Sequence, residues 1–543
     1  MNANDIINGF QKAKDDRVVV DGTWEDLLYF VAPRKRGVNS EYQPGEKPSS
    51  DVYDDTAIQS NLFLAAALSG YMTNATQRWF ELRCRDEQTM DNAEVRSFFA
   101  KSSEIMYLTL ANSNFYQQIH EVYIDLGAVG TATIYEDDDA KDIVRFYTRH
   151  PREIFIVEDD REEVNMVYRK FQMTAWQAYG FFGKEHVGEK VRKCVEEQKD
   201  YGKKFDFIHH VCPRYKRDTR KIDNKNKPFA SYWVNVEDKR IVRESGYEEF
   251  PYFCPRFYKN SGETYGYGPA YTSYPSTVRL NNATECYETG AYQDAYPAWL
   301  AENDGLMGTL DLRRDAINYQ RQPLSQGQAV QSLRHTRNIQ VGIDYMDRQA
   351  EKIKKAFFVD LFLMLVQSPN MTATEVIERT NEKMFVLGPV LGRLQSELLN
   401  PIIYRTFNIL LRKGLLPEVP QALQGKDWDV VYVSPLAKAQ RAVQAKDMQT
   451  FLAIVAQMAQ GGLPEALDKV KTDETIDKFG KVYSIDPDII ASTDEANAKR
   501  EQRAQAQAQM QKVQMMMAAA QGAKTAGEAT HQFAKAENLK SGK

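Results

Sequence analysis

The chain has 543 residues, of which 43% are hydrophobic and 27% are charged, and its net charge is −5. This length is enough for roughly three or four domains. The small net charge argues against a protein that grips nucleic acid tightly, but not against one that lets nucleic acid slide past.

Cysteine usage and apolar runs exclude two further classes of protein. The five cysteines form no CxxC pair, which predicts reduced, buried thiols rather than a disulfide or zinc framework. They are Cys84, Cys194, Cys212, Cys254 and Cys286. The N-terminus is polar, without a signal peptide, and the best apolar run, 357–366, is far shorter than the about 20 residues of a membrane span. We therefore expect a soluble protein made in the cytoplasm.

The N-terminal half is predicted to contain helices followed by antiparallel strands. Helices are expected at 24–31, 56–73, 92–112, 115–126 and 174–182, with a short strand at 79–82. From Gly127 the pattern changes to short β-rich runs at 130–135, 144–147, 154–157, 164–168, 205–213, 229–236, 241–244 and 252–255. The acidic runs 136–139 and 158–160 are expected to be solvated turns. The first four runs, separated by these acidic segments, predict an antiparallel meander, and the later runs predict further strands.

The segment Gly262–Pro269 is the clearest boundary, a glycine-rich hinge before a helix that begins with proline. That helix is expected to continue to about residue 302, and Pro275 and Pro297 predict that it bends or starts late. Residues 303–342 hold turn formers, and a helix is expected at 343–366.

A break at 367–371 precedes the longest helical pattern, 372–413, which would span ~60 Å if straight. Thr372 and Glu375 fit a capping box that fixes the helix start. Gly388 and Pro389 predict a kink, and Pro401 a second one. A link with a strand at 428–433 follows, then helices from 436 and at 495–521, and a tail after Gly522 that is expected to be disordered.

No motif indicates a catalytic centre, a metal site or a cofactor. The residues around Gly180–Glu185 do not match a phosphate-binding loop. His209 and His210 are neighbours in a predicted strand, so their rings would point to opposite faces and could not chelate one ion. A nuclease metal site at the acidic runs 136–139 or 158–160 remains as an alternative. Residues 303–342 are locally basic and could contact phosphates or, equally, another protein.

The order of these elements resembles that of the portal (head-to-tail connector) proteins of short-tailed bacteriophages. The motifs that carry the resemblance are Asn370–Val376, Leu387–Val390, Arg393–Leu394, Glu397–Pro401, Tyr432–Gln440, Tyr265–Pro269 and the Ala/Gln/Met-rich end. The resemblance covers essentially the whole chain. It implies an α+β, mainly helical fold, with wing, stem, clip and C-terminal helical crown, assembled as a ring of twelve subunits, with no enzymatic activity and no cofactor.

The resemblance also implies a division of the chain. It assigns 1–268 to the wing, 269–302 to the first stem helix, 303–342 to the clip, 343–366 to the second stem helix, 367–371 to the tunnel loop, 372–435 to a long kinked wing helix with its link, and 436–543 to the crown and flexible tail. The implied channel loop is Gln367, Ser368, Pro369, Asn370 and Met371, and the implied clip contacts are Arg313, Arg314, Arg321, Arg334 and Arg337.

The implied location is the capsid vertex of a virion, at the head–tail junction. The implied partners are further copies of the chain, terminase, the major capsid and scaffolding proteins, tail adaptor or nozzle and internal core proteins, and double-stranded DNA passing through without sequence specificity. The implied roles are genome packaging, retention and ejection, and tail attachment. An internal scaffold or ejection protein is the alternative that the Ala/Gln/Met-rich end favours.

Overall fold

The computed structural model describes the chain in several stretches. These are residues 1–39, 51–90, 92–221, 223–296, 299–302, 311, 313, 316–320, 330–332, 339–366, 387–433, 448–459, 470–471, 473–476, 479, 496–511 and 516. Two compact units divide the chain. The first comprises 1–82, 101–418 and 430–437, and the second comprises 83–100, 419–429 and 438–543.

The N-terminal helices form much of the first unit. They are α1 (Ala3–Val31), the 3-10 turn η1 (Pro33–Lys35), α2 (Thr56–Met72) and α5 (Phe115–Val129). Helix α1 is much longer than the predicted 24–31, and Pro33 follows its end as expected. The predicted helix at 56–73 is confirmed by α2, and α5 confirms the one at 115–126.

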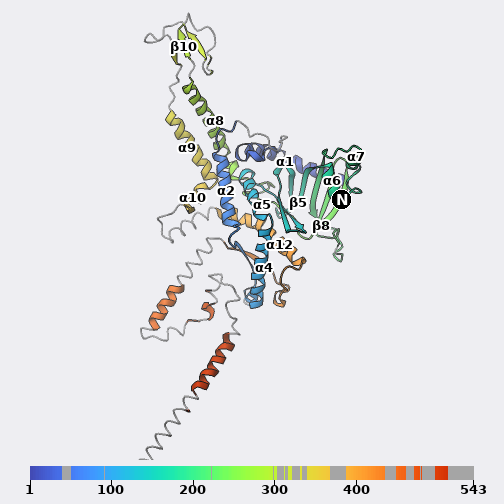
Figure 1. The fold of residues 1–543 in the computed structure, drawn as a ribbon, viewed down its shortest axis with the longest axis vertical. Coiled ribbons are helices and arrows are strands. Elements are labelled where there is room, and N and C mark those ends of the chain that lie inside the picture. The colour runs from blue at the N-terminus through green and yellow to red at the C-terminus, as the bar shows by residue number, and fades with distance from the viewer. Residues whose placement is uncertain are drawn as a thin grey trace, which may run out of the picture. The chain divides into compact units, whose positions relative to one another are not determined.

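Five strands form an antiparallel meander, which confirms that topology for the predicted runs 154–157 and 164–168. The other two runs of the predicted meander, 130–135 and 144–147, do not belong to this sheet. Its strands are β4 (Ile154–Glu158), β5 (Val164–Thr174), β6 (Lys204–Pro213), β7 (Phe229–Asn235) and β8 (Arg240–Tyr247), paired in sequence order. The 3-10 turn η2 (Pro151–Glu153) precedes β4. On one face Ile6 and Phe10 of α1 pack against Phe155, Tyr168 and Ile208. On the other face lie α6 (Ala175–Phe182), which was predicted, and α7 (Glu189–Glu196), which was not (Figure 1).

A separate three-stranded sheet, in the order β3-β2-β9, is made of β3 (Ile143–Thr148), β2 (Ile134–Asp139) and β9 (Tyr252–Phe253). Here the prediction for the acidic run 136–139 is wrong. These residues lie within β2 and pair with β3, Glu136 opposite Phe146. Glu136 is fully buried, so this run is not a solvated turn.

Two long helices come next in the first unit, one before and one after a small sheet in the sequence. Helix α8 (Pro269–Ala295) packs against α9 (Ile339–Ala356), and Figure 1 shows the two side by side. Strand β10 (Trp299–Glu302) pairs in parallel with β11 (Ile317–Gln320) and antiparallel with β12 (Val330–Ser332). The predicted helical end at 302 is therefore wrong, because 299–302 form a strand. The continuous helix to 366 is also wrong, since Phe358, at φ 58°, separates α9 from α10 (Val359–Val366).

The last described helix of the first unit contains an irregular turn. Residues 387–394 are α-helical, η3 (Gln395–Leu399) is a π-helical turn, and α12 (Asn400–Arg412) continues the helix. A two-stranded sheet pairs β1 (Phe80–Cys84) with β13 (Trp428–Tyr432), confirming both predicted strands.

The remaining elements are short or belong wholly or partly to the second unit. They are α3 (Glu87–Met90), α4 (Ala93–Asn112), the 3-10 turn η4 (Gln421–Leu423) and helical residues at 448–459 and 496–511. The tail after Gly522 lies outside the described residues. Among the described helices, none has the length and apolarity that a bilayer crossing requires.

Candidate functional site

The glycine-rich segment at the base of α8 is tightly packed rather than free. The Gly266 amide donates to Thr131 Oγ1 at 2.8 Å. A Cβ on Gly268 would lie 2.6 Å from the Leu126 carbonyl oxygen, closer than real Cβ contacts allow. Gly130, at φ 76°, approaches the same segment so closely that a Cβ there would lie 2.2 Å from the Tyr267 carbonyl carbon. Gly266 and Gly268 therefore permit close backbone approach, whereas Gly262, at φ 80°, has open space around it, and the hinge stays a prediction.

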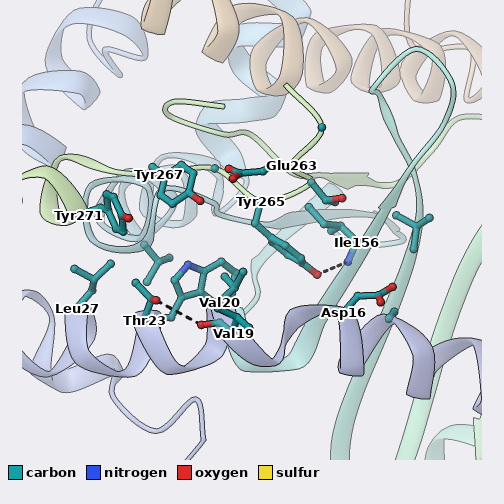
Figure 2. A pocket seen from close by; sticks show the side chains of 17 residues that line it. Asp16, Val19, Val20, Thr23, Leu27, Ile156, Glu263, Tyr265, Tyr267 and Tyr271 are labelled. Carbon is teal, nitrogen blue, oxygen red and sulfur yellow. Dashed lines mark hydrogen bonds between the residues drawn. The ribbon is translucent and has the colours of Figure 1, made fainter. Parts of the chain in front are cut away.

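A pocket of about 500 Å³ lies between α1 and the segment 262–271 (Figure 2). The Tyr265 ring packs edge-on against Trp24 at 5.4 Å between ring centroids, and its hydroxyl accepts from the Ile156 amide at 3.2 Å. Among its described lining residues the pocket contains the carboxylates Asp16 and Glu263 and no Lys or Arg. Tyr265 thus holds the base of α8 against α1 and the sheet.

Helix α8 contacts both the segment before α2 and helix α9. Asn281 of α8 is buried, accepts from the Tyr53 amide at 2.7 Å and donates to the Asp51 carbonyl at 3.0 Å. Thr284 lies 3.8 Å from the Met346 sulfur across the pair. Three tyrosines of the pair are exposed: Tyr287, Tyr292 and Tyr345 are 40%, 68% and 43% exposed.

Of the predicted clip arginines, Arg313 is described. It is 88% exposed along its side chain and its guanidinium forms a two-pronged ion pair with Asp311, 2.6 Å at the shortest. Hydrogen bonding to Arg313 lowers the pKa of Asp311 to about 2. Asn318 of β11 fixes the turn by bonding both the amide and the carbonyl of Asp311, at 2.6 and 2.7 Å. The remaining four, Arg314, Arg321, Arg334 and Arg337, lie outside the described residues.

The predicted channel loop, Gln367, Ser368, Pro369, Asn370 and Met371, also lies outside the described residues. So do Thr372 and Glu375, the predicted cap. Gly388 and Pro389 fall in the helical stretch 387–394, and since the residues before 387 are not described, the kink there stays a prediction.

The π-helical turn η3 lies where the second kink was predicted. Pro401 stands just after it, in the first turn of α12. A proline inside an α-helix lacks the amide that would bond the fourth residue back, and its ring crowds that carbonyl. A turn widened by one residue is one way to accommodate such a proline, and π-helical turns occur often at functional sites.

Glu397 of η3 binds a buried arginine that the sequence interpretation did not single out. The Arg256 side chain, 2% exposed, donates through Nε and a terminal nitrogen to Glu397 at 3.0 and 2.9 Å, and its backbone amide also bonds Glu397. The same guanidinium binds Glu158 and donates to the carbonyl of Thr264 in the packed segment. Although burial opposes the charge, these carboxylates raise the pKa of Arg256. Arg256 therefore ties β4, the base of α8 and the π-helical turn together.

The acidic run 158–160 was predicted to be a solvated turn, and for Glu158 this is wrong. Its side chain is 13% exposed and contacts both Arg256 and Lys259, the latter at 2.8 Å. A sequence signal existed, because Glu397 is a charged residue among buried leucines, but the partner stands 141 residues away.

Glu136 forms a second buried polar contact with this helix. The Thr406 hydroxyl donates to Glu136 Oε1 at 3.0 Å. Arg405 Nε stands 3.7 Å from Oε2, and neither of these two atoms has a hydrogen-bond partner among the described residues. Arg405 instead bonds Glu249 through its terminal nitrogen. Burial therefore dominates and raises the pKa of Glu136 to about 8, despite the nearby Arg405.

These contacts argue against a metal-dependent active site at the acidic runs 136–139 and 158–160. Glu136 and Glu158 are each bound by other side chains, and the described residues contain no group of three metal-binding side chains. His209 bonds Tyr252 and Ser231, at 2.8 and 3.0 Å. His210 points to the opposite face, as predicted, and stacks on Tyr168 at 4.0 Å. All five cysteines are free, and the prediction that all are buried is wrong for Cys286, which is exposed.

Comparison with known proteins finds a protein family that matches most of this chain. Residues 3–490 match the family described as "Bacteriophage head to tail connecting protein". The chain is similar to the portal protein of Salmonella phage epsilon15, with 29% identity over 96% of this chain and 95% of that protein. It is also similar to a probable portal protein of Bordetella phage BPP-1, with 32% identity over 93% and 91% of the two chains.

Solved structures give a weaker likeness. The neck of an empty gene transfer agent particle matches at 9% identity and a TM-score of 0.34, covering 74% of this chain and 87% of the other. The native gene transfer agent virion matches at 10% identity and the same TM-score, covering 74% and 86%.

Proposed function

We propose a mechanical role in DNA passage for this chain, which belongs to the family of bacteriophage head-to-tail connecting proteins, the portal proteins. Membership makes it a structural, non-enzymatic component of the virion at the head–tail junction. We infer that copies of it form a ring, of twelve subunits, around a channel for double-stranded DNA. In this ring 269–302 and 343–366, which contain α8, most of α9 and α10, form the stem, 303–342 with β11 and β12 is the clip, and 1–268 is the wing.

The observation that carries the ring is the exposed aromatic surface of the α8–α9 pair. Tyr287, Tyr292 and Tyr345 stand in solvent in a single copy, whereas tyrosines are enriched where proteins contact each other. Copies related by rotation would bring this surface against a different face of the neighbour, a contact that closes into a ring. The tightly packed base of α8 would then hold each pair at a fixed angle to its wing.

The remaining assignments extend this role. We propose that residues 367–371 are the tunnel loop, that 372–435 form the long wing helix and its link, and that 436–543 form the crown and flexible tail. Arg313, Arg314, Arg321, Arg334 and Arg337 are proposed to meet terminase during packaging and the tail adaptor afterwards. The exposed side chain of Arg313 supports this contact. A partner would bind an Arg313 guanidinium that is already paired with Asp311. Capsid, scaffolding and internal core proteins complete the proposed partners, and genome packaging, retention and ejection are the proposed processes.

Electron microscopy of the purified protein tests the ring. We expect closed rings in negative stain at micromolar concentration and physiological salt. Replacing Tyr287, Tyr292 and Tyr345 together by Ser should shift the protein towards monomers, as measured by mass photometry. The matched control replaces Trp176 and Tyr201, which are also exposed, at 61% and 47%. A wild-type protein that stays monomeric refutes the proposal, and rings that survive the triple change refute the role of this surface.

A further inference from the structure

A strongly basic hairpin joins β6 to β7 in the proposed wing, and none of the contacts described above involves it. Residues 214–227 contain seven basic and two acidic residues, in a chain whose net charge is −5. The basic residues are Arg214, Lys216, Arg217, Arg220, Lys221, Lys225 and Lys227. Apart from Ile222, which is not described, the tip residues 215–225 are all exposed. Positive charge is thus concentrated at one end of the five-stranded sheet.

The hairpin is anchored at its base rather than loosely attached. Arg214 forms an ion pair with Glu244 at 3.1 Å and donates to the carbonyls of Ser245 and Asn224. Gly246 of β8 lies so close that a Cβ there would be 2.5 Å from the Asn224 oxygen. The position of the hairpin over the sheet edge is therefore defined by contacts on both of its arms.

The two acidic side chains of the hairpin are used within it. Asp218 accepts from the Arg220 amide at 3.1 Å, and Asp223 accepts from the Asn226 side chain. Lys221 stands 3.9 Å from Asp218, the limit of an ion pair. Among the described residues no carboxylate pairs with Lys216, Arg217, Arg220 or Lys225. The local carboxylates therefore organise the turns and leave most of the positive charge facing solvent.

The composition of this surface favours phosphate as its ligand. Lysine is depleted from protein–protein interfaces, whereas Lys, Arg, Thr, Asn and Tyr side chains supply most contacts to nucleic-acid phosphates. The hairpin offers all five types, including Thr219, Asn224 and Tyr215, which is 87% exposed. We propose that this hairpin binds the phosphate backbone of double-stranded DNA outside the channel, independently of sequence. The proposal rests on the portal function, which brings the genome to this protein.

Salt-dependent DNA binding by the full-length, assembled protein tests this proposal. The probe is a short fluorescent duplex of mixed sequence, titrated at several KCl concentrations. Replacing Lys216, Arg217 and Arg220 together by Gln should lower the slope of log K against log salt by about 2.7, since each phosphate contact contributes about 0.9. At about 0.1 M salt each lost contact corresponds to roughly eightfold weaker binding. Adding Lys221→Gln and Lys225→Gln, on the returning arm of the hairpin, should lower the slope of log K against log salt by about 1.8 more.

The matched control neutralises three lysines at the opposite end of the same strand. Lys199, Lys203 and Lys204 are exposed, and their replacement by Gln should leave affinity and slope unchanged. Wild-type slope in the hairpin variant overturns the proposal. Loss of binding to poly-glutamate with DNA binding intact also overturns it, in favour of an acidic protein. Negative-stain images of the same samples separate the two hypotheses: rings with unchanged DNA binding refute the hairpin alone, and absence of rings refutes the portal assembly.

Discussion

Replacing Glu136 by Gln tests whether this buried carboxyl group is held neutral. Its side chain is fully buried in β2, with the Thr406 hydroxyl on one oxygen. Gln has nearly the same shape and carries no charge, and its amide oxygen can accept the same hydrogen bond. If burial keeps Glu136 protonated at neutral pH, the substitution changes few contacts.

The expected magnitude follows from the pKa difference. The pKa of Glu136 is raised from its usual 4.5 to about 8, because burial penalises the charged form. The unfolded chain releases the proton above pH 4.5 while the folded chain keeps it to about pH 8. The contribution of Glu136 to stability is therefore full below pH 4.5 and is lost as the pH rises to about 8. At ~1.4 kcal/mol per pH unit, wild type should lose about 4 kcal/mol relative to the variant between about pH 5 and pH 8.

The difference in unfolding free energy between wild type and Glu136→Gln is measured by urea denaturation in matched buffers, followed by intrinsic fluorescence. The contributions of all other titrating groups cancel in this difference. Asp139→Asn is the control on the same strand. The pKa of Asp139 is lowered by hydrogen bonds from the Asp142 and Lys141 amides, so its contribution is lost only in acid and is constant across this range. The reasoning is refuted if Glu136→Gln keeps the wild-type pH dependence. A loss of about 3–5 kcal/mol near pH 6 would also refute it, because that is the cost of breaking a buried ion pair.

Three further perturbations have defined outcomes. Arg256→Met should destabilise the first unit by about 3 kcal/mol, the lower end for breaking a buried ion pair, because Glu397 loses its guanidinium partner while Glu158 keeps only Lys259. Hydrogen exchange should rise in residues 387–412, and unchanged protection there would contradict the role of this arginine. Gly268→Ala should lower the melting temperature, at a cost of about 1–3 kcal/mol for an overpacked site, while Gly342→Ala, with open space around it, should not; equal melting points would show that the packed segment can relax. Deleting residues 367–371 should reduce DNA retention in filled particles without preventing ring formation in negative stain; loss of rings would show that these residues are structural.

Local patterns predicted most regular elements because those elements depend on nearby residues. The β-rich composition of short runs sufficed to predict the strands β4 to β8. The proline after α1 marked its end, and Pro269 marked the start of α8. In each case the signal and the structure it specifies lie within a few residues of each other.

Two of the misses have a different cause, which is contact with distant parts of the chain, and a third has no signal in composition. Glu136 is buried because Thr406, 270 residues away, supplies a hydrogen bond. Residues 299–302 form a strand because β11 and β12 pair with them on both sides. The break at Phe358 falls inside a continuous apolar run, so no change of composition announces its positive φ.

The hydrogen-bonded backbone of residues 262–268, at the base of α8, determines how the protein responds to a pulling force on α8. If residues 262–268 formed a free loop, a pull could extend it to a total span of at most ~3.4 Å per residue. Here Gly266 bonds Thr131 at 2.8 Å, and Tyr267 and Tyr258 exchange backbone hydrogen bonds at 2.8 and 3.0 Å. A pull along α8 is therefore borne by bonds to the body of the first unit before any chain can extend. Displacement of α8 under load must involve α5 and the sheet together, as one elastic body.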